Sequence, residues 1–162
     1  MILGGEQISP EQKIVLHKLA GSVAKPGCKL LEVGSWCGDS TVILGKAAQK
    51  YGGHLFCVYW WKGNFGTELD KIACNVDVFS VFWSRICSEG LEDVVVPIRT
   101  RSDIAAQVLK DNTFDLIFID GDHRYDAVIQ DIKLYAPLVK REKGILCGHD
   151  CEGYISDYDS SF

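Results

Sequence analysis

The fold is decided by the stretch Leu30-Leu31-Glu32-Val33-Gly34-Ser35-Trp36-Cys37-Gly38-Asp39-Ser40. Residues 29–33 form a short, largely apolar run, which predicts a buried strand, and residues 39–51 repeat apolar side chains at helical spacing. Between them, Gly34 permits a tight turn and the close approach of a ligand, and Gly38 lets the helix begin near the strand. The free backbone N–H groups at the start of that helix can then face the ligand.

The spacing of these glycines excludes two common classes of nucleotide-binding turn. The pattern G-x-x-x-G differs from the G-x-G-x-x-G pattern of dinucleotide-binding folds, and no Lys-Ser or Lys-Thr pair follows Gly38, which excludes a phosphate-binding P-loop. Glu32 stands just before the first glycine, where its carboxylate would repel a pyrophosphate and would suit a cationic ligand. The turn therefore favours a positively charged small molecule.

Outward from this turn, short apolar runs alternate with longer periodic segments, which is typical of β-α units around a parallel sheet. An N-terminal helix begins at Ser9-Pro10, where Ser9 and Gln12 can form a capping box, and ends at Pro26-Gly27. The further helices are expected at 39–51, 68–89, 102–110 and 125–139, and the five strands at 29–33, 55–60, 94–98, 114–119 and 144–147. Right-handed crossovers would wind them into a doubly wound α/β fold, with ligands at the carboxyl ends of the strands.

Composition narrows the class of protein. The chain has 162 residues, 47% of them hydrophobic, and a formal net charge of −5, so we expect one soluble domain that binds neither nucleic acid nor a membrane. We divide it into an N-terminal helix (1–27), a ligand-binding core (28–150) and an irregular tail (151–162). The seven cysteines are odd in number and form no C-x-x-C pair, which favours reduced thiols, a cytoplasmic location and no zinc site.

Residues 32–40 resemble the first motif of class I S-adenosylmethionine-dependent methyltransferases, particularly the small O-methyltransferases of the catechol and caffeoyl-CoA type and their bacterial relatives. The resemblance implies a Rossmann-like fold in which this loop wraps the methionine part of the cofactor. Glu32 would help to hold that end, and Ser40 would cap the helix and approach the cofactor carboxylate. The cofactor-binding residues so implied are Glu32, Gly34, Ser35, Trp36, Gly38, Ser40, Tyr59, Ser102 and Asp120.

Two of these positions need comment. Family members usually carry an acid at the tip of the second strand, where a carboxylate accepts two hydrogen bonds from the ribose diol, but this chain has Tyr59, which can make one. Trp60 or Trp61 could flank the adenine or the substrate entrance, and both could equally well only pack. Ser102, after the third strand, would border the adenine, cap its helix, or do both.

The strongest signal is the run 114–125, in which a very apolar strand ends in Asp120-Gly121-Asp122-His123. It is similar to the D-G-D-H segment of bacterial methyltransferases related to macrocin and cephalosporin-pathway enzymes. In metal-dependent relatives the first acid binds a divalent cation, which maps onto Asp120, and a second pair of ligands follows the fifth strand, here His149-Asp150. A cation such as Mg²⁺ would activate a substrate hydroxyl, and a histidine ligand also admits transition metals. In the alternative, Asp120 only lines the cofactor pocket.

The sequence thus predicts S-adenosylmethionine-dependent O-methylation of a small-molecule acceptor, with His123 as general base and Asp120 beside it. The family sheet has seven strands, and the residues after Asp150 are too few for the last two. Either the sequence is a truncated form of the family domain, or a partner completes the sheet. We therefore expect five strands with an open edge that invites pairing with a second copy, giving a homodimer or a marginally stable domain. The main alternative is a non-catalytic binding or oligomerisation module; a nucleotide-binding oxidoreductase is disfavoured by the glycine spacing.

Overall fold

A five-stranded parallel sheet organises the part of the chain that the computed structural model describes, residues 8–149. The strand order is β3-β2-β1-β4-β5. From β1 the chain first adds strands on one side of the sheet and then crosses to the other side, so the topological switch point lies between β1 and β4. The strands are β1 (Lys29–Val33), β2 (His54–Tyr59), β3 (Val95–Arg99), β4 (Leu116–Ile119) and β5 (Ile145–Gly148). This confirms the doubly wound α/β fold, and every strand pair in the described sheet is parallel.

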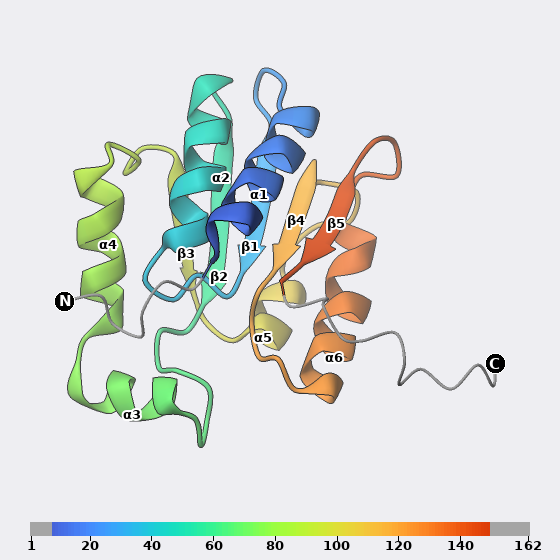
Figure 1. Ribbon diagram of the computed structural model, residues 1–162. Coiled ribbons are helices and arrows are strands. Elements are labelled where there is room, and N and C mark those ends of the chain that lie inside the picture. The colour runs from blue at the N-terminus through green and yellow to red at the C-terminus, as the bar shows by residue number, and fades with distance from the viewer. Residues whose placement is uncertain (1–7, 150–162) are drawn as a thin grey trace.

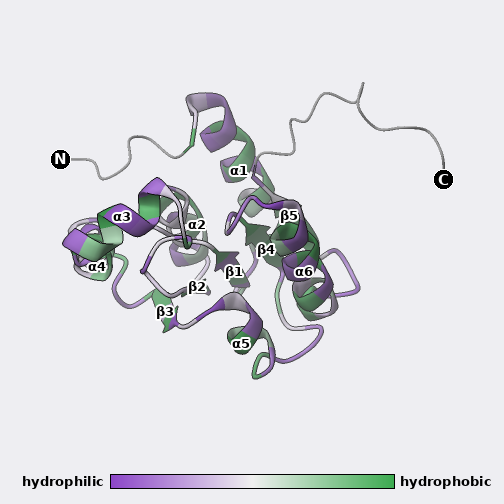
Figure 2. Cartoon of the chain, turned by 90° about the horizontal axis from the view of Figure 1, so that it is seen from below, coloured by the Kyte–Doolittle hydropathy of each residue, from purple (hydrophilic) through white to green (hydrophobic). Residues whose placement is uncertain are grey.

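Helices cover both faces of the sheet (Figure 1). They are α1 (Pro10–Val23), α2 (Asp39–Lys50), α3 (Glu68–Asn75), α4 (Val78–Ser88), α5 (Ser102–Ala106), α6 (Tyr125–Tyr135) and the 3-10 turn η1 (Ala136–Leu138). Helices α1, α2 and α4 share a hydrophobic cluster with one face, and a second cluster lies against α6 on the other. Figure 2 looks onto the ends of the strands and shows β1 between α2 and α5.

Side chains cap the starts of α1, α3 and α4. Ser9 and Gln12 form the expected capping box at the start of α1. One expectation was wrong, since the predicted helix 68–89 is two helices. Val76 leaves the helical conformation, and the carboxylate of Asp77 accepts a hydrogen bond from the backbone N–H of Ser80 to begin α4. A side chain that caps a new helix at this point competes with continuation of the old one.

Smaller differences lie at element ends. Helix α5 stops at Ala106 instead of residue 110, and α6 passes into η1 at Ala136, ahead of Pro137. The strands begin and end within two residues of their predicted bounds. The predicted tail 151–162 lies outside the described residues, and the division of the whole chain into one domain stays a prediction.

Register brings the functional strand ends together. Val33 of β1 pairs with Ile119 of β4, so the residues that follow these strands, Gly34 and Asp120, are neighbours. The backbone N–H of Asp120 donates to the carbonyl of Val33 at 2.7 Å, and that of His149 donates to the carbonyl of Ile119 at 2.9 Å. The parallel pairing therefore delivers one polar side chain after another to the same edge of the sheet.

Two further findings concern residues 8–149. No helix described there has both the length and the apolar character that crossing a bilayer demands. All cysteines in this range are free thiols, as expected, namely Cys28, Cys37, Cys57, Cys74, Cys87 and Cys147.

Candidate active site

Two adjoining cavities open at the carboxyl ends of the strands. The larger cavity has a volume of about 410 Å³ and the smaller cavity about 300 Å³. The larger is lined by Gly34, Ser35, Trp36, Cys37, Asp39, Ser40, Tyr59, Asn64, Thr67, Leu69, Asp120, Gly121, Asp122, His123 and Arg124. Gly34, Tyr59 and Gly121 also border the smaller cavity, so the two lie end to end across β1, β2 and β4.

Gly34 borders both cavities and lets the ends of β1 and β4 come close together there. Its φ is +95°, and a Cβ atom built there would lie 1.9 Å from the carbonyl oxygen of Asp120. No other residue type could place the β1 and β4 ends so close together. Gly38 also has a left-handed backbone, with a φ of +91°, and begins α2 without a side-chain cap.

Glu32 lies behind the glycine loop and lines neither cavity. Its carboxylate is fully buried, accepts a hydrogen bond from the Thr41 hydroxyl at 2.5 Å, and leaves Oε1 without a hydrogen bond of ordinary geometry among the described residues. Burial raises the pKa of Glu32, although hydroxyl groups led by that of Ser35 counteract the rise. The structure thus places Glu32 beneath the loop and in contact with the hydroxyls that shape it.

The two tryptophans after β2 have different surroundings. Trp61 is 3% exposed; its ring centroid lies 4.8 Å from that of Phe82 and 5.6 Å from that of Tyr59, and its indole N–H donates to the carbonyl of Trp36 at 2.8 Å. Trp60 instead borders the smaller cavity. Of the two roles considered for these tryptophans, Trp61 therefore has the packing role, and Trp60 flanks the site.

Asp120, His123 and His149 form a compact cluster at the ends of β4 and β5. Oδ1 of Asp120 lies 3.2 Å from Nδ1 of His149 and 3.4 Å from Nε2 of His123. One potential ligand atom from each residue falls within 4.8 Å of the others, a grouping that could hold a metal ion. His123 is half-exposed and lines the larger cavity, whereas His149 is nearly buried and borders a separate apolar cavity below α1.

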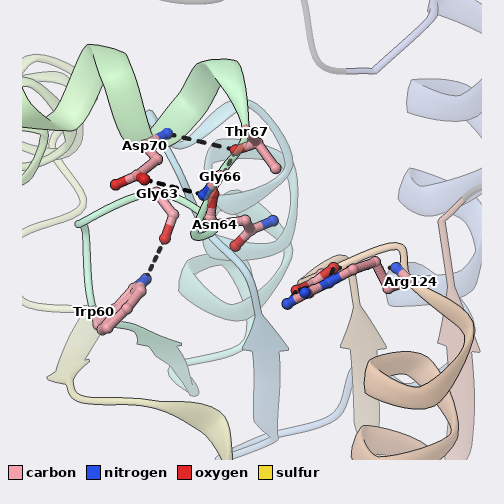
Figure 3. A network of polar contacts seen from close by, with 8 residues as sticks. Trp60, Gly63, Asn64, Gly66, Thr67, Asp70 and Arg124 are labelled. Carbon is pink, nitrogen blue, oxygen red and sulfur yellow. Dashed lines mark hydrogen bonds and ion pairs between the residues drawn. The ribbon is translucent and has the colours of Figure 1, made fainter.

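A loop that sequence reasoning did not assign to the site borders both cavities, through Asn64 in each. In Figure 3 the side chain of Asn64 faces Arg124 across the site, and the loop is tied by hydrogen bonds from Trp60 to the Gly63 carbonyl and from Thr67 to the Asn64 carbonyl, both 2.6 Å. Arg124 donates to both oxygens of Asp122. The turn residues Gly63, Asn64 and Gly66 were the available signal, because they predict a loop next to a strand end.

The structure brings most of the predicted cofactor residues together. Ser35, Trp36, Ser40 and Asp120 border the larger cavity, Ser102 borders the smaller one, and Gly34 and Tyr59 border both. Glu32 and Gly38 lie outside both linings, and Asp150 lies outside the described residues.

The expected capping roles of two serines were wrong. Gly38 is the cap of α2 and Arg101 that of α5, so Ser40 and Ser102 are already inside their helices. In each case the helix begins before the serine. The Ser40 hydroxyl interacts with the buried carboxylate of Glu32, and the Ser102 hydroxyl with that of Asp131. Each interaction acts to lower the pKa of the carboxyl group, against the effect of burial.

Comparison with known proteins gives a consistent family. A family model described as a methyltransferase domain matches residues 31–151. Among solved structures, cofactor-bound Rv0187 from MTB is 24% identical, with a TM-score of 0.59 over 80% of this chain and 53% of that one. The O-methyltransferase from Bacillus cereus in complex with SAH is 23% identical, with a TM-score of 0.61 over 82% and 55%.

A third similar structure is the O-methyltransferase TomG from Streptomyces achromogenes in complex with SAM, which is 20% identical, with a TM-score of 0.62 over 81% of this chain and 52% of that one. At these identities the likeness is one of fold. The chain spans about half the length of the solved structures it matches.

Proposed function

This chain belongs to the methyltransferase-domain family, and we propose that it binds S-adenosylmethionine and transfers the methyl group to an oxygen atom of a small molecule. The observation that supports this most directly is the pair of adjoining cavities joined over Gly34, Tyr59 and Gly121. S-adenosylmethionine is an elongated molecule with a charged amino-acid and sulfonium end and an adenosine end that carries a planar adenine. The larger cavity, which is lined by the glycine-loop residues Ser35, Trp36 and Ser40, suits the first end, and the smaller cavity, flanked by Trp60, suits the second.

The charge of the larger cavity fits a sulfonium ion. Asp39, Asp120 and Asp122 border it. Asp39 is ion-paired with Arg85 and Asp122 with Arg124, so Asp120 is the carboxylate proposed to face the sulfonium. Gly34 brings the ends of β1 and β4 together at this cavity. Ser35 and Ser40 border the cavity, and their hydroxyls also interact with the Glu32 carboxylate behind the loop. Glu32 would act from behind, since its buried carboxylate orders the loop hydroxyls. Tyr59, at the junction, is placed to donate one hydrogen bond to the ribose.

When bound, the cofactor supplies an electrophilic methyl group on sulfur. The chain must orient the acceptor oxygen in line with it, exclude water and remove the hydroxyl proton. His123 is the proposed general base, because its imidazole lines the larger cavity and Nε2 faces the Asp120 carboxylate, which would stabilise the imidazolium that forms.

A second proposal assigns Asp120, His149 and His123 to a divalent cation, with Asp150 as a further candidate ligand; with the cation bound, His123 would be a ligand and not the base. One carboxylate and two imidazoles favour a transition metal over Mg²⁺. We expect Co²⁺ added to the protein to give a visible absorption band that saturates at one equivalent, and Asp120→Asn to remove it. An unchanged band in that variant, or no band in the parent protein, would leave Asp120 as a pocket residue only.

The proposal is tested by calorimetry with S-adenosylhomocysteine. We expect a dissociation constant on the order of micromolar, equivalent to roughly 8 kcal/mol. Gly38→Val should abolish binding, because its Cβ would lie 3.3 Å from the Phe82 ring and the backbone φ of +91° strains a branched residue. Gly52→Val is the matched control: its φ is +61° and nothing lies within 4 Å, so binding should persist.

The outcomes separate the alternatives. No binding by the folded parent protein would favour a non-catalytic module, and binding of NAD instead would favour an oxidoreductase. Thermal unfolding of each variant shows whether a loss of binding is a loss of fold. A homodimer and a cytoplasmic location stay predictions from the sequence.

A further inference from the structure

Three carboxylates line the smaller cavity, and their partners differ. Asp103 is held by Arg101, whose Nε and Nη2 donate at 3.0 and 2.8 Å, and Asp122 is held by Arg124. Asp131, on α6, has no arginine or lysine partner among residues 8–149. Two of the three charges are therefore neutralised within the protein, and one is not.

Asp131 is also the most enclosed of the three. The residue is 5% exposed, and its carboxylate has the Ser102 hydroxyl as a hydrogen-bond partner. Burial raises its pKa, and repulsion by Asp103 and Asp122 adds to the rise. A Cβ on Gly121 would lie 3.2 Å from Oδ2, so the carboxylate sits directly against the loop that ends β4. A carboxylate has more lone pairs than the Ser102 hydroxyl uses, so Asp131 can accept a second hydrogen bond from a donor on a ligand in the cavity.

The walls around Asp131 define the shape of such a ligand. Val58, Trp60 and Ala127 supply apolar and aromatic surface, and Ala127 lies one helical turn before Asp131 on α6. A flat heterocycle would fill the space, with a donor on its edge directed at the carboxylate. An exocyclic amino group is such a donor.

We propose that Asp131 is a specificity-determining residue, whose carboxylate accepts a hydrogen bond from the 6-amino group of the bound purine. This rests on the proposed function and deepens it, because it names the group by which the cofactor is selected. A site built around a buried acceptor rejects an analogue that lacks the donor, since the acceptor is then left unpaired.

The test compares S-adenosylhomocysteine with the analogue in which hydrogen replaces the 6-amino group. Calorimetry on the parent protein should show the analogue binding about 10- to 100-fold more weakly, the usual effect of one hydrogen bond to a charged group. In Asp131→Ala this preference should fall to within about threefold, whatever the change in overall affinity. Comparing the two ligands in one variant removes effects of general loosening, because these weaken both equally.

Asp103→Ala is the matched control, since that carboxylate lines the same cavity but is already held by Arg101. Its preference for the 6-amino ligand should persist. Equal affinity of the parent protein for the two ligands would overturn the assignment of Asp131, as would a preference that survives in Asp131→Ala. If neither ligand binds the folded parent protein, the proposed function itself fails, which is a separate result.

Discussion

Gly34→Ala should lower the free energy of unfolding by about 3–5 kcal/mol, the upper range for a single substitution. The new Cβ would fall 1.9 Å from the carbonyl oxygen and 2.4 Å from the carbonyl carbon of Asp120, and both are backbone atoms that cannot rotate away. The φ of +95° adds a further cost of about 1 kcal/mol for an alanine. Urea unfolding followed by circular dichroism measures the change.

The same substitution should remove ligand binding, because separating the ends of β1 and β4 moves Asp120 relative to the glycine loop. Gly90→Ala is the control: it has a φ of +66° but no atom within 4 Å of its added Cβ, so it isolates the backbone cost. We expect that variant to lose only about 1 kcal/mol. Equal losses in the free energy of unfolding in the two variants would show that the contact with Asp120 adds nothing to the backbone cost.

Trp61→Ala should be the second large effect, with a loss of about 3–5 kcal/mol in the free energy of unfolding. The Trp61 ring packs against Phe79, Phe82 and Tyr59 with centroid distances of 4.9, 4.8 and 5.6 Å, and its N–H holds the Trp36 carbonyl of the glycine loop. Truncation would leave a cavity between β2 and α4 and an unpaired carbonyl.

Trp60→Ala serves as the comparison, because Trp60 borders the smaller cavity and is only partly buried. It should cost less stability, under about 2 kcal/mol, and act mainly on ligand affinity. A reversal of this order in chemical denaturation would contradict the division of roles between the two tryptophans. Trp61→Phe, which keeps a ring, should recover part of the stability and would separate packing from the hydrogen bond.

Tyr59 stands at the tip of β2, where family members usually carry an acid, and its surroundings suggest a second role for the residue. Tyr59 is 9% exposed, and its ring contacts those of Trp36 and Trp61 in edge-to-face geometry. Burial raises the pKa of Tyr59, so the phenol stays protonated and can act as a donor. The residue therefore joins the aromatic packing under the glycine loop to the ligand-binding edge, a coupling that an aspartate could not provide.

Short-range sequence patterns predicted the elements whose conformation depends on neighbouring residues in the chain. The β1 strand, the turn at Gly34 and Gly38, the Ser9 cap and the order of β-α units follow from short-range patterns of apolar residues, glycines and caps. They failed at Val76, where a helical pattern of apolar residues continues across a break made by Asp77, and at Ser40 and Ser102, where hydroxyls turn to buried carboxylates instead of helix ends.

What the sequence by itself determined is the five strands, the order of the β-α units, the family resemblance and the strand ends at which polar residues gather, because strand and turn formation depend on neighbours along the chain. Only the tertiary structure decided that Glu32 lies behind the loop and that Trp61 packs while Trp60 borders a cavity. It also decided that Asp131 is buried without a lysine or arginine partner among residues 8–149. Those roles depend on burial and on partners far away in sequence, which arise when β1, β4 and α6 pack together.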